Sequence, residues 1–184
     1  MKTAIIDTPA KERVIAALER YKQTDADLQD YRATSSKAEV EEQKGLDDPK
    51  LTEQEAADKI SRAQNLKSVY ASRIKHREAA LGKEEKALMS VRVTAAGELT
   101  GLVHREHQKR EALFRKRVLA ASEYPQDAPV THGLDLLFGA SPLRRAIIEC
   151  EPRNYAILRL KAPQIAEELI GLFDRFEAEV EKDV

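Results

Sequence analysis

Side chains of low polarity recur at alternating three- and four-residue steps near the start of the chain, which places them along one side of a helix. The series follows Thr8-Pro9, a pair suited to a helix start because proline has a fixed φ and lacks the amide hydrogen that would be unpaired there. Its members are Val14, Ala17, Tyr21, Thr24, Leu28, Tyr31, Ser35 and Ala38.

A second and much longer helix is predicted for residues 52–123, because no proline falls between Pro49 and Pro125. Thr52 and Glu55 have the spacing of a capping box, in which each side chain accepts from the other residue's amide. The helix should end before Pro125, since proline has no amide hydrogen to continue the ladder. At ~1.5 Å per residue it would be roughly 105 Å long.

The two helices should form an antiparallel hairpin, since the connection between them is short. We expect the first to end near Lys44-Gly45, with glycine in a left-handed closing conformation, and Asp47-Asp48-Pro49 to make the turn. The second seam comprises Ile60, Ala63, Lys67, Tyr70, Ile74, Arg77, Leu81, Glu84, Leu88 and Val91. Polar residues occupy seam positions of both helices where Leu or Ile would pack best, so the interior of the hairpin is predicted to be poor; they are Thr24, Ser35, Lys67, Arg77 and Glu84.

The long helix has an ambiguous point at residues 91–101, which hold two glycines and four β-branched residues. Their summed propensities cost a helix ~4 kcal/mol relative to alanine. The segment has no Pro, Asn or Asp, so we expect a continuous helix, in which Gly97 and Gly101 would let another helix approach. The alternative is a break that folds residues 102–123 back into a three-helix bundle.

The C-terminal third contains a well-defined amphipathic helix that begins at Pro163. We expect it to dock on an apolar arc in the second half of the long helix. The helix presents Ile165, Leu169, Leu172, Phe173, Phe176 and Val180, and the arc presents Leu99, Leu102, Val103, Leu113, Phe114 and Ala121. A helix is also expected after Ser141-Pro142, and residues 154–161 fit a short helix or a strand.

These patterns predict an all-α fold: a long antiparallel helical hairpin or coiled coil built on one long helix, with a small C-terminal helical subdomain. Residues 1–123 would form the elongated hairpin or coiled-coil region. Residues 124–184 would form the C-terminal region that ends in the amphipathic helix. The composition agrees, since 34% of residues are charged and 5% aromatic, a bias typical of long helices.

Composition also limits the classes of function. A single cysteine, Cys150, allows no internal disulfide and no thiol pair for a metal, and fits a reducing compartment. No segment approaches the ~20 apolar residues of a membrane span. We therefore expect a cytoplasmic protein that does not associate with a membrane.

Local motifs predict no catalytic, cofactor-binding or metal-binding residues. His104 and His107 are three residues apart on a helix, but no carboxylate pattern accompanies them. Gly82-Lys83 lacks the preceding glycine and the strand that a phosphate loop requires. We accordingly expect no enzyme and no cofactor.

The chemistry that remains is that of surfaces. A basic cluster lies at residues 104–118, and the interaction surface we predict comprises Arg105, Lys109, Arg110, Lys116, Arg117, Phe173 and Phe176. We expect a non-enzymatic helical assembly or adaptor protein that binds a protein partner or itself, as a homo-oligomer. A structural or scaffolding component of a phage or mobile element would have this composition. The alternative is a nucleic-acid-associated helical protein that uses the basic face.

Overall fold

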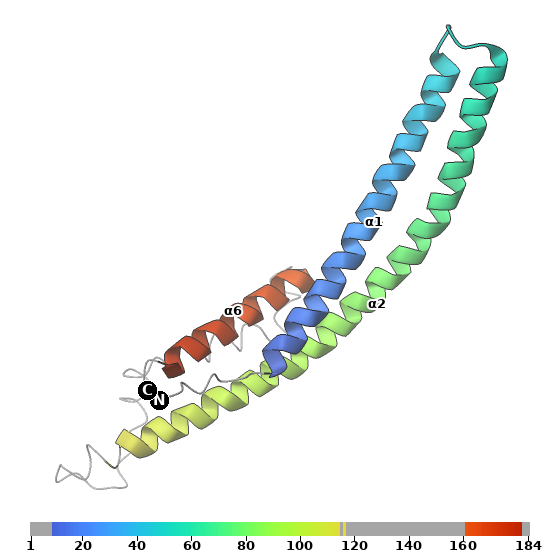
Figure 1. The fold of residues 1–184 in the computed structure, drawn as a ribbon. Coiled ribbons are helices and arrows are strands. Elements are labelled where there is room, and N and C mark those ends of the chain that lie inside the picture. Colours follow the sequence, from blue (N-terminus) through green and yellow to red (C-terminus); the bar gives the residue numbers. More distant parts are fainter. Residues whose placement is uncertain (1–8, 115, 117–160, 182–184) are drawn as a thin grey trace. The chain divides into compact units, whose positions relative to one another are not determined.

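The structure is a computed structural model that describes residues 9–114, 116 and 161–181 (Figure 1). Within these residues lie the helices α1 (Pro9–Asp47), α2 (Glu53–Phe114) and α6 (Ala162–Glu181), and no strand. α1 and α2 form an antiparallel helical hairpin, and α6 is a small C-terminal helix. The all-α prediction is confirmed.

The predicted helix starts are confirmed in atomic detail. α1 begins at Pro9. Before α2, the Thr52 amide donates to a Glu55 carboxylate oxygen at 3.0 Å, and the Glu55 amide donates to the Thr52 hydroxyl at 3.3 Å. This reciprocal pair is the predicted capping box, and it satisfies amides that have no partner inside the helix.

The predicted end of α1 is wrong by a few residues, because Gly45 does not terminate the helix. α1 continues to Asp47, and the turn follows, with the Lys50 amide donating to the Asp48 side chain at 3.0 Å. Gly45 is buried against α2, where a Cβ atom would lie 3.1 Å from Cγ1 of Ile60. Glycine therefore eases the close approach of the two helices here and does not form a left-handed cap.

α2 runs unbroken through residues 91–101, so the alternative of a break and a three-helix bundle is wrong. Gly97 and Gly101 nevertheless do not serve the close approach that we expected. Both are exposed, and no described atom lies within 4 Å of a Cβ placed on either. The helix tolerates their low propensity because the residues between and around them pack well, among them Leu88, Ala95, Ala96 and Leu99.

The chain divides into two compact units. The described part of unit 1 is residues 9–18, 88–114, 116 and 161–181, and unit 2 is residues 19–87. Both α1 and α2 contribute to each unit. The predicted boundary between residues 123 and 124 lies outside the described residues, so the division proposed there stays a prediction.

Unit 1 holds most of the buried apolar side chains. From α6 these are Ala162, Ile165, Ala166, Leu169, Leu172, Phe173 and Phe176, from α1 Ala10, Val14, Ala17 and Leu18, and from α2 Leu88, Ala95, Ala96, Leu99 and Val103. α6 contacts both other helices, because Lys11 of α1 pairs with Glu177, and Arg110 of α2 donates to the Glu179 carbonyl at 3.3 Å. The predicted docking of the C-terminal helix on α2 is confirmed.

Leu113 is an exception to the predicted apolar arc. It is 50% exposed, although it shares a helical face with the buried Leu99. The contact of α6 with α2 at Arg110, through the Glu179 carbonyl, lies three residues before Leu113. Several other predictions fall outside the described part of the chain. They concern the side chain of Phe114, Ala121, the helix expected after Ser141-Pro142 and residues 154–160.

Unit 2 is an antiparallel pair of helices with a poor interior, as predicted. Every seam position proposed from the sequence within it is buried or half-buried. Its buried apolar side chains among the described residues are Leu28, Ala38 and Ala63. Ion pairs join the two helices instead: Asp27 with Arg77 at 2.7 Å, Glu42 with Lys67 at 2.8 Å, Arg32 with Glu78 at 2.8 Å and Arg20 with Glu84 at 3.5 Å. Partly exposed ion pairs contribute about 0 to 1 kcal/mol each to the free energy of unfolding. Unit 2 is therefore stabilised weakly, both by its few buried apolar side chains and by its ion pairs.

Candidate functional site

The basic cluster near the end of α2 is partly neutralised. Lys109 lies 3.4 Å from one Glu106 oxygen, and Nε of Arg110 lies 3.3 Å from the other. Arg110 is also tied to α6 through the Glu179 carbonyl. Of the five predicted cations, Arg105 and Lys116 are exposed and form no ion pair within the described residues, and Arg117 lies outside them.

Phe173 and Phe176 are not available to a partner. Their exposed fractions are 0% and 4%, because both face the interior of unit 1. Both side chains therefore serve the predicted docking of α6 within the chain. The stripe that they belong to is used within the chain, where each large apolar side chain contributes about 1.5 to 3 kcal/mol by burial.

His104 and His107 of α2 do not assemble a metal centre with described residues. No group of three or more His, Cys, Asp or Glu residues that could hold a metal lies within the part of the chain that the structure describes. The Nε2 atom of His104 lies 3.0 Å from the Gln108 side-chain amide, one turn along the same helix.

Lys11 is an interaction residue that the sequence patterns did not reveal. Its ammonium lies 2.6 Å from both a Glu177 and an Asp174 carboxylate oxygen of α6. Hydrogen bonds to Asp174 and Glu177 raise the pKa of Lys11 above its ordinary value of 10.5. The local signal was slight, since a lysine in the first turn of an amphipathic helix is ordinary.

Arg92 is a second residue that the patterns missed. It is 1% exposed, the one buried charged side chain of the described residues. A signal existed, because Arg92 stands four residues after Leu88 and four before Ala96, in the centre of the stripe that faces the core. Burying a guanidinium is costly unless polar groups surround it, which makes this position sensitive to substitution.

An aromatic cluster joins α1 to α2 inside unit 2. The rings of Tyr31 and Tyr70 meet edge to face with centroids 5.7 Å apart. The guanidinium of Arg73 lies 5.3 Å from the Tyr70 centroid and 5.9 Å from that of Tyr31. Both contacts have favourable geometry for the ring quadrupoles, so the cluster stabilises the polar seam at its middle.

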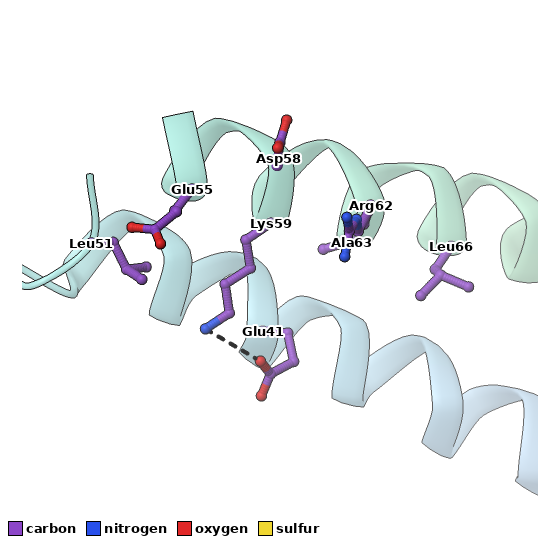
Figure 2. Close-up of a pocket in the computed structure, with 8 residues that line it drawn as sticks. All are labelled: Glu41, Leu51, Glu55, Asp58, Lys59, Arg62, Ala63 and Leu66. Atoms are coloured by element: carbon purple, nitrogen blue, oxygen red, sulfur yellow. Dashed lines mark ion pairs between the residues drawn. The ribbon is translucent and has the colours of Figure 1, made fainter. Parts of the chain in front are cut away.

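A groove of about 570 Å³ lies where α1 and α2 meet near their connecting turn (Figure 2). We call it the turn groove. Its lining residues are Glu41, Leu51, Glu55, Asp58, Lys59, Arg62, Ala63 and Leu66. Leu51 from the turn and Leu66 from α2 lie at its two ends, and Lys59 reaches toward Glu41 of α1 at 3.7 Å (Figure 2).

The charges of the turn groove fall into two groups. Glu41 is held by Lys44 at 2.9 Å and by Lys59, and these contacts lower the pKa of Glu41 below its ordinary value. The Thr52 amide likewise lowers the pKa of Glu55. Asp58 and Arg62, in contrast, form no ion pair with any described residue.

Large apolar side chains are exposed in the half of the hairpin that contains the turn groove. Leu66 and Val69 are 48% and 49% exposed, and Val40 and Leu46 of α1 are 52% and 63% exposed. The sequence patterns assigned none of these four residues to a seam, and gave no sign that they share one end of the hairpin. The antiparallel pairing of α1 and α2 brings these four residues to the same half of the hairpin.

None of the helices in the described residues is long and apolar enough to span a membrane. No protein-family model, curated protein or solved structure matches the chain.

Proposed function

We propose that the chain is a non-enzymatic helical assembly or adaptor protein that acts by binding other protein surfaces. The observation that carries the proposal is the contrast within unit 2. Its interior holds three buried apolar side chains, while four large apolar side chains are exposed near the turn. Large exposed apolar side chains on a small helical hairpin are typical of a protein interaction site when they lie together, as Leu66 and Val69 do on one face of α2.

The ion pairs of unit 2 support the same role. They fix the register of the two helices without filling the interior, because charge pairs select an arrangement more than they stabilise it. With this register fixed, the residues on the outer faces of the two helices keep defined positions relative to one another. A structural or scaffolding component needs such a surface.

Site-specific photo-cross-linking tests the proposal. Leu66 is replaced by a benzophenone amino acid in the full chain, and the protein is irradiated in the cells that produce it naturally. We expect a discrete protein adduct, because a bound partner would cover this side chain. Val93 of unit 1, which is 46% exposed, provides the matched control position. Equal or absent adducts at both positions would contradict the proposal.

Nucleic-acid binding by residues 104–118 is the second candidate, favoured by the exposure of Arg105 and Lys116. The ion pairs of Lys109 and Arg110 with Glu106 reduce the positive charge that this face can direct toward nucleic-acid phosphates. We expect no tight binding of duplex or single strands at physiological salt. A fluorescence-anisotropy titration that shows tight binding, weakening steeply with salt and lost in Arg105→Glu with Lys116→Glu, would favour this candidate instead.

A further inference from the structure

We infer that the turn groove and the adjoining face of α2 are the contact between two copies of this chain. The inference rests on the proposed function, and it names the partner. The surface involved carries Leu51, Asp58, Arg62, Leu66 and Val69, and lies wholly within unit 2.

The exposed residues of this face form a continuous stripe on α2. At 100° per residue, Arg62, Leu66, Val69 and Arg73 fall within about 60° of one another on the helix. The stripe therefore leads from the turn groove to the Tyr31–Tyr70–Arg73 cluster. Its centre is apolar, and cations lie on each side of that centre.

The charges of the turn groove complement themselves. Asp58 and Arg62 carry opposite charges one turn apart, and neither forms an ion pair within the described residues. In a two-fold contact the same patch faces itself in the reverse direction. Asp58 of one copy then faces Arg62 of the other, and the pair occurs twice.

The apolar residues agree with the same alignment. If two copies of this segment cross antiparallel about position 60, Asp58 stands opposite Arg62, and Leu51 stands opposite Val69. Leu51 is half-buried and Val69 is 49% exposed, so both have surface left to cover. The charge pairs thus specify the register, in which Leu66 stands opposite Gln54 and the apolar residues beside the charges add buried surface.

Charge reversal in the full-length protein tests this register. Arg62→Glu places two carboxylates opposite each other across the two-fold, and Asp58→Lys places two cations there. We expect each single variant to weaken self-association at least ~10-fold, since like charges at an interface are strongly unfavourable. The double variant Asp58→Lys with Arg62→Glu restores opposite charges and should recover the wild-type affinity within a few fold.

Sedimentation equilibrium at micromolar concentration provides the measurement, and circular dichroism checks that each variant stays helical. Leu66→Asp should also produce monomers, whereas Val93→Asp, the control in unit 1, should leave the association unchanged. A monomeric wild-type protein at high micromolar concentration would overturn the inference. An oligomer that none of the unit 2 variants weakens would overturn it too.

The failure of this inference can be distinguished from failure of the proposed function. If the wild-type protein is monomeric but position 66 cross-links to a different protein in cells, the assembly role stands and the second copy is the wrong partner. If position 66 yields no protein adduct at all, both proposals fail.

Discussion

The ammonium of Lys11 in the first turn of α1 lies 2.6 Å from the carboxylate of Glu177 in α6, across 166 positions of sequence. Both side chains are about one-fifth exposed. The same ammonium contacts Asp174 one turn earlier in α6. Lys11 therefore fixes the position of α6 along α1, while the apolar stripe of α6 supplies the stability.

The Lys11 contact should give unit 1 a pH-dependent component at alkaline pH. Because the folded pKa of Lys11 is raised above 10.5, its contribution is fully present below pH 10.5 and is lost as pH rises through the higher folded value. Lys11→Met should lower the free energy of unfolding by at most about 1 kcal/mol at pH 7. Thermal unfolding from pH 8 to 11 should show the gap between wild type and variant closing. A gap that stays constant would contradict the linkage.

Phe173→Ala should destabilise the protein by about 3 to 5 kcal/mol, because it removes a fully buried ring and leaves a cavity. Leu113→Ala is the matched control, since Leu113 is half exposed and its truncation should change the free energy of unfolding by less than about 0.5 kcal/mol. Chemical denaturation followed by circular dichroism measures both variants. Similar midpoints for the two would show that α6 is not part of the unit 1 core.

Unit 2 should lose stability in acid through its carboxylates. Hydrogen bonds from Lys67 and Gln64 lower the pKa of Glu42 below the ordinary 4.5. The contribution of Glu42 to the stability of the folded state is therefore present above pH 4.5. It is lost as pH falls through the lowered pKa that Glu42 has in the folded state. The melting temperature of wild type should fall more steeply than that of Glu42→Gln between pH 6 and pH 3. Parallel curves would show that this pair does not stabilise the hairpin.

Two glycine substitutions should have different outcomes. Gly97→Ala should stabilise by about 1 kcal/mol, because alanine is the better helix former and no described atom obstructs its Cβ. Gly45→Ala has the same propensity gain but places Cβ 3.1 Å from Cγ1 of Ile60, so it should stabilise less or destabilise. Thermal melts of the two variants provide the comparison. An equal gain at both positions would show that the helices can separate slightly at Gly45.

Much of the fold is encoded in local spacing. The capping box of Thr52 and Glu55 needs residues three apart, and the stripe of α6 needs apolar residues at helical intervals. Both were therefore predictable from the sequence alone. The seam residues of unit 2 were predictable for the same reason, since a helix turns its side chains by a fixed angle at every step.

Tertiary structure decided which long-range neighbours each face meets. The ion pair of Lys11 with Glu177 depends on the packing of α6 beside α1, and the exposed fractions of Leu113 and Arg92 differ although both residues lie on the apolar side of α2. The turn groove depends on the antiparallel pairing that brings Glu41 beside Lys59. Helical periodicity defines a direction around each helix, but it carries no information on how far along that helix a partner extends. The candidate interaction surface that we propose therefore lies on the exposed residues of the hairpin near its turn, because the phenylalanines of α6 are buried inside unit 1.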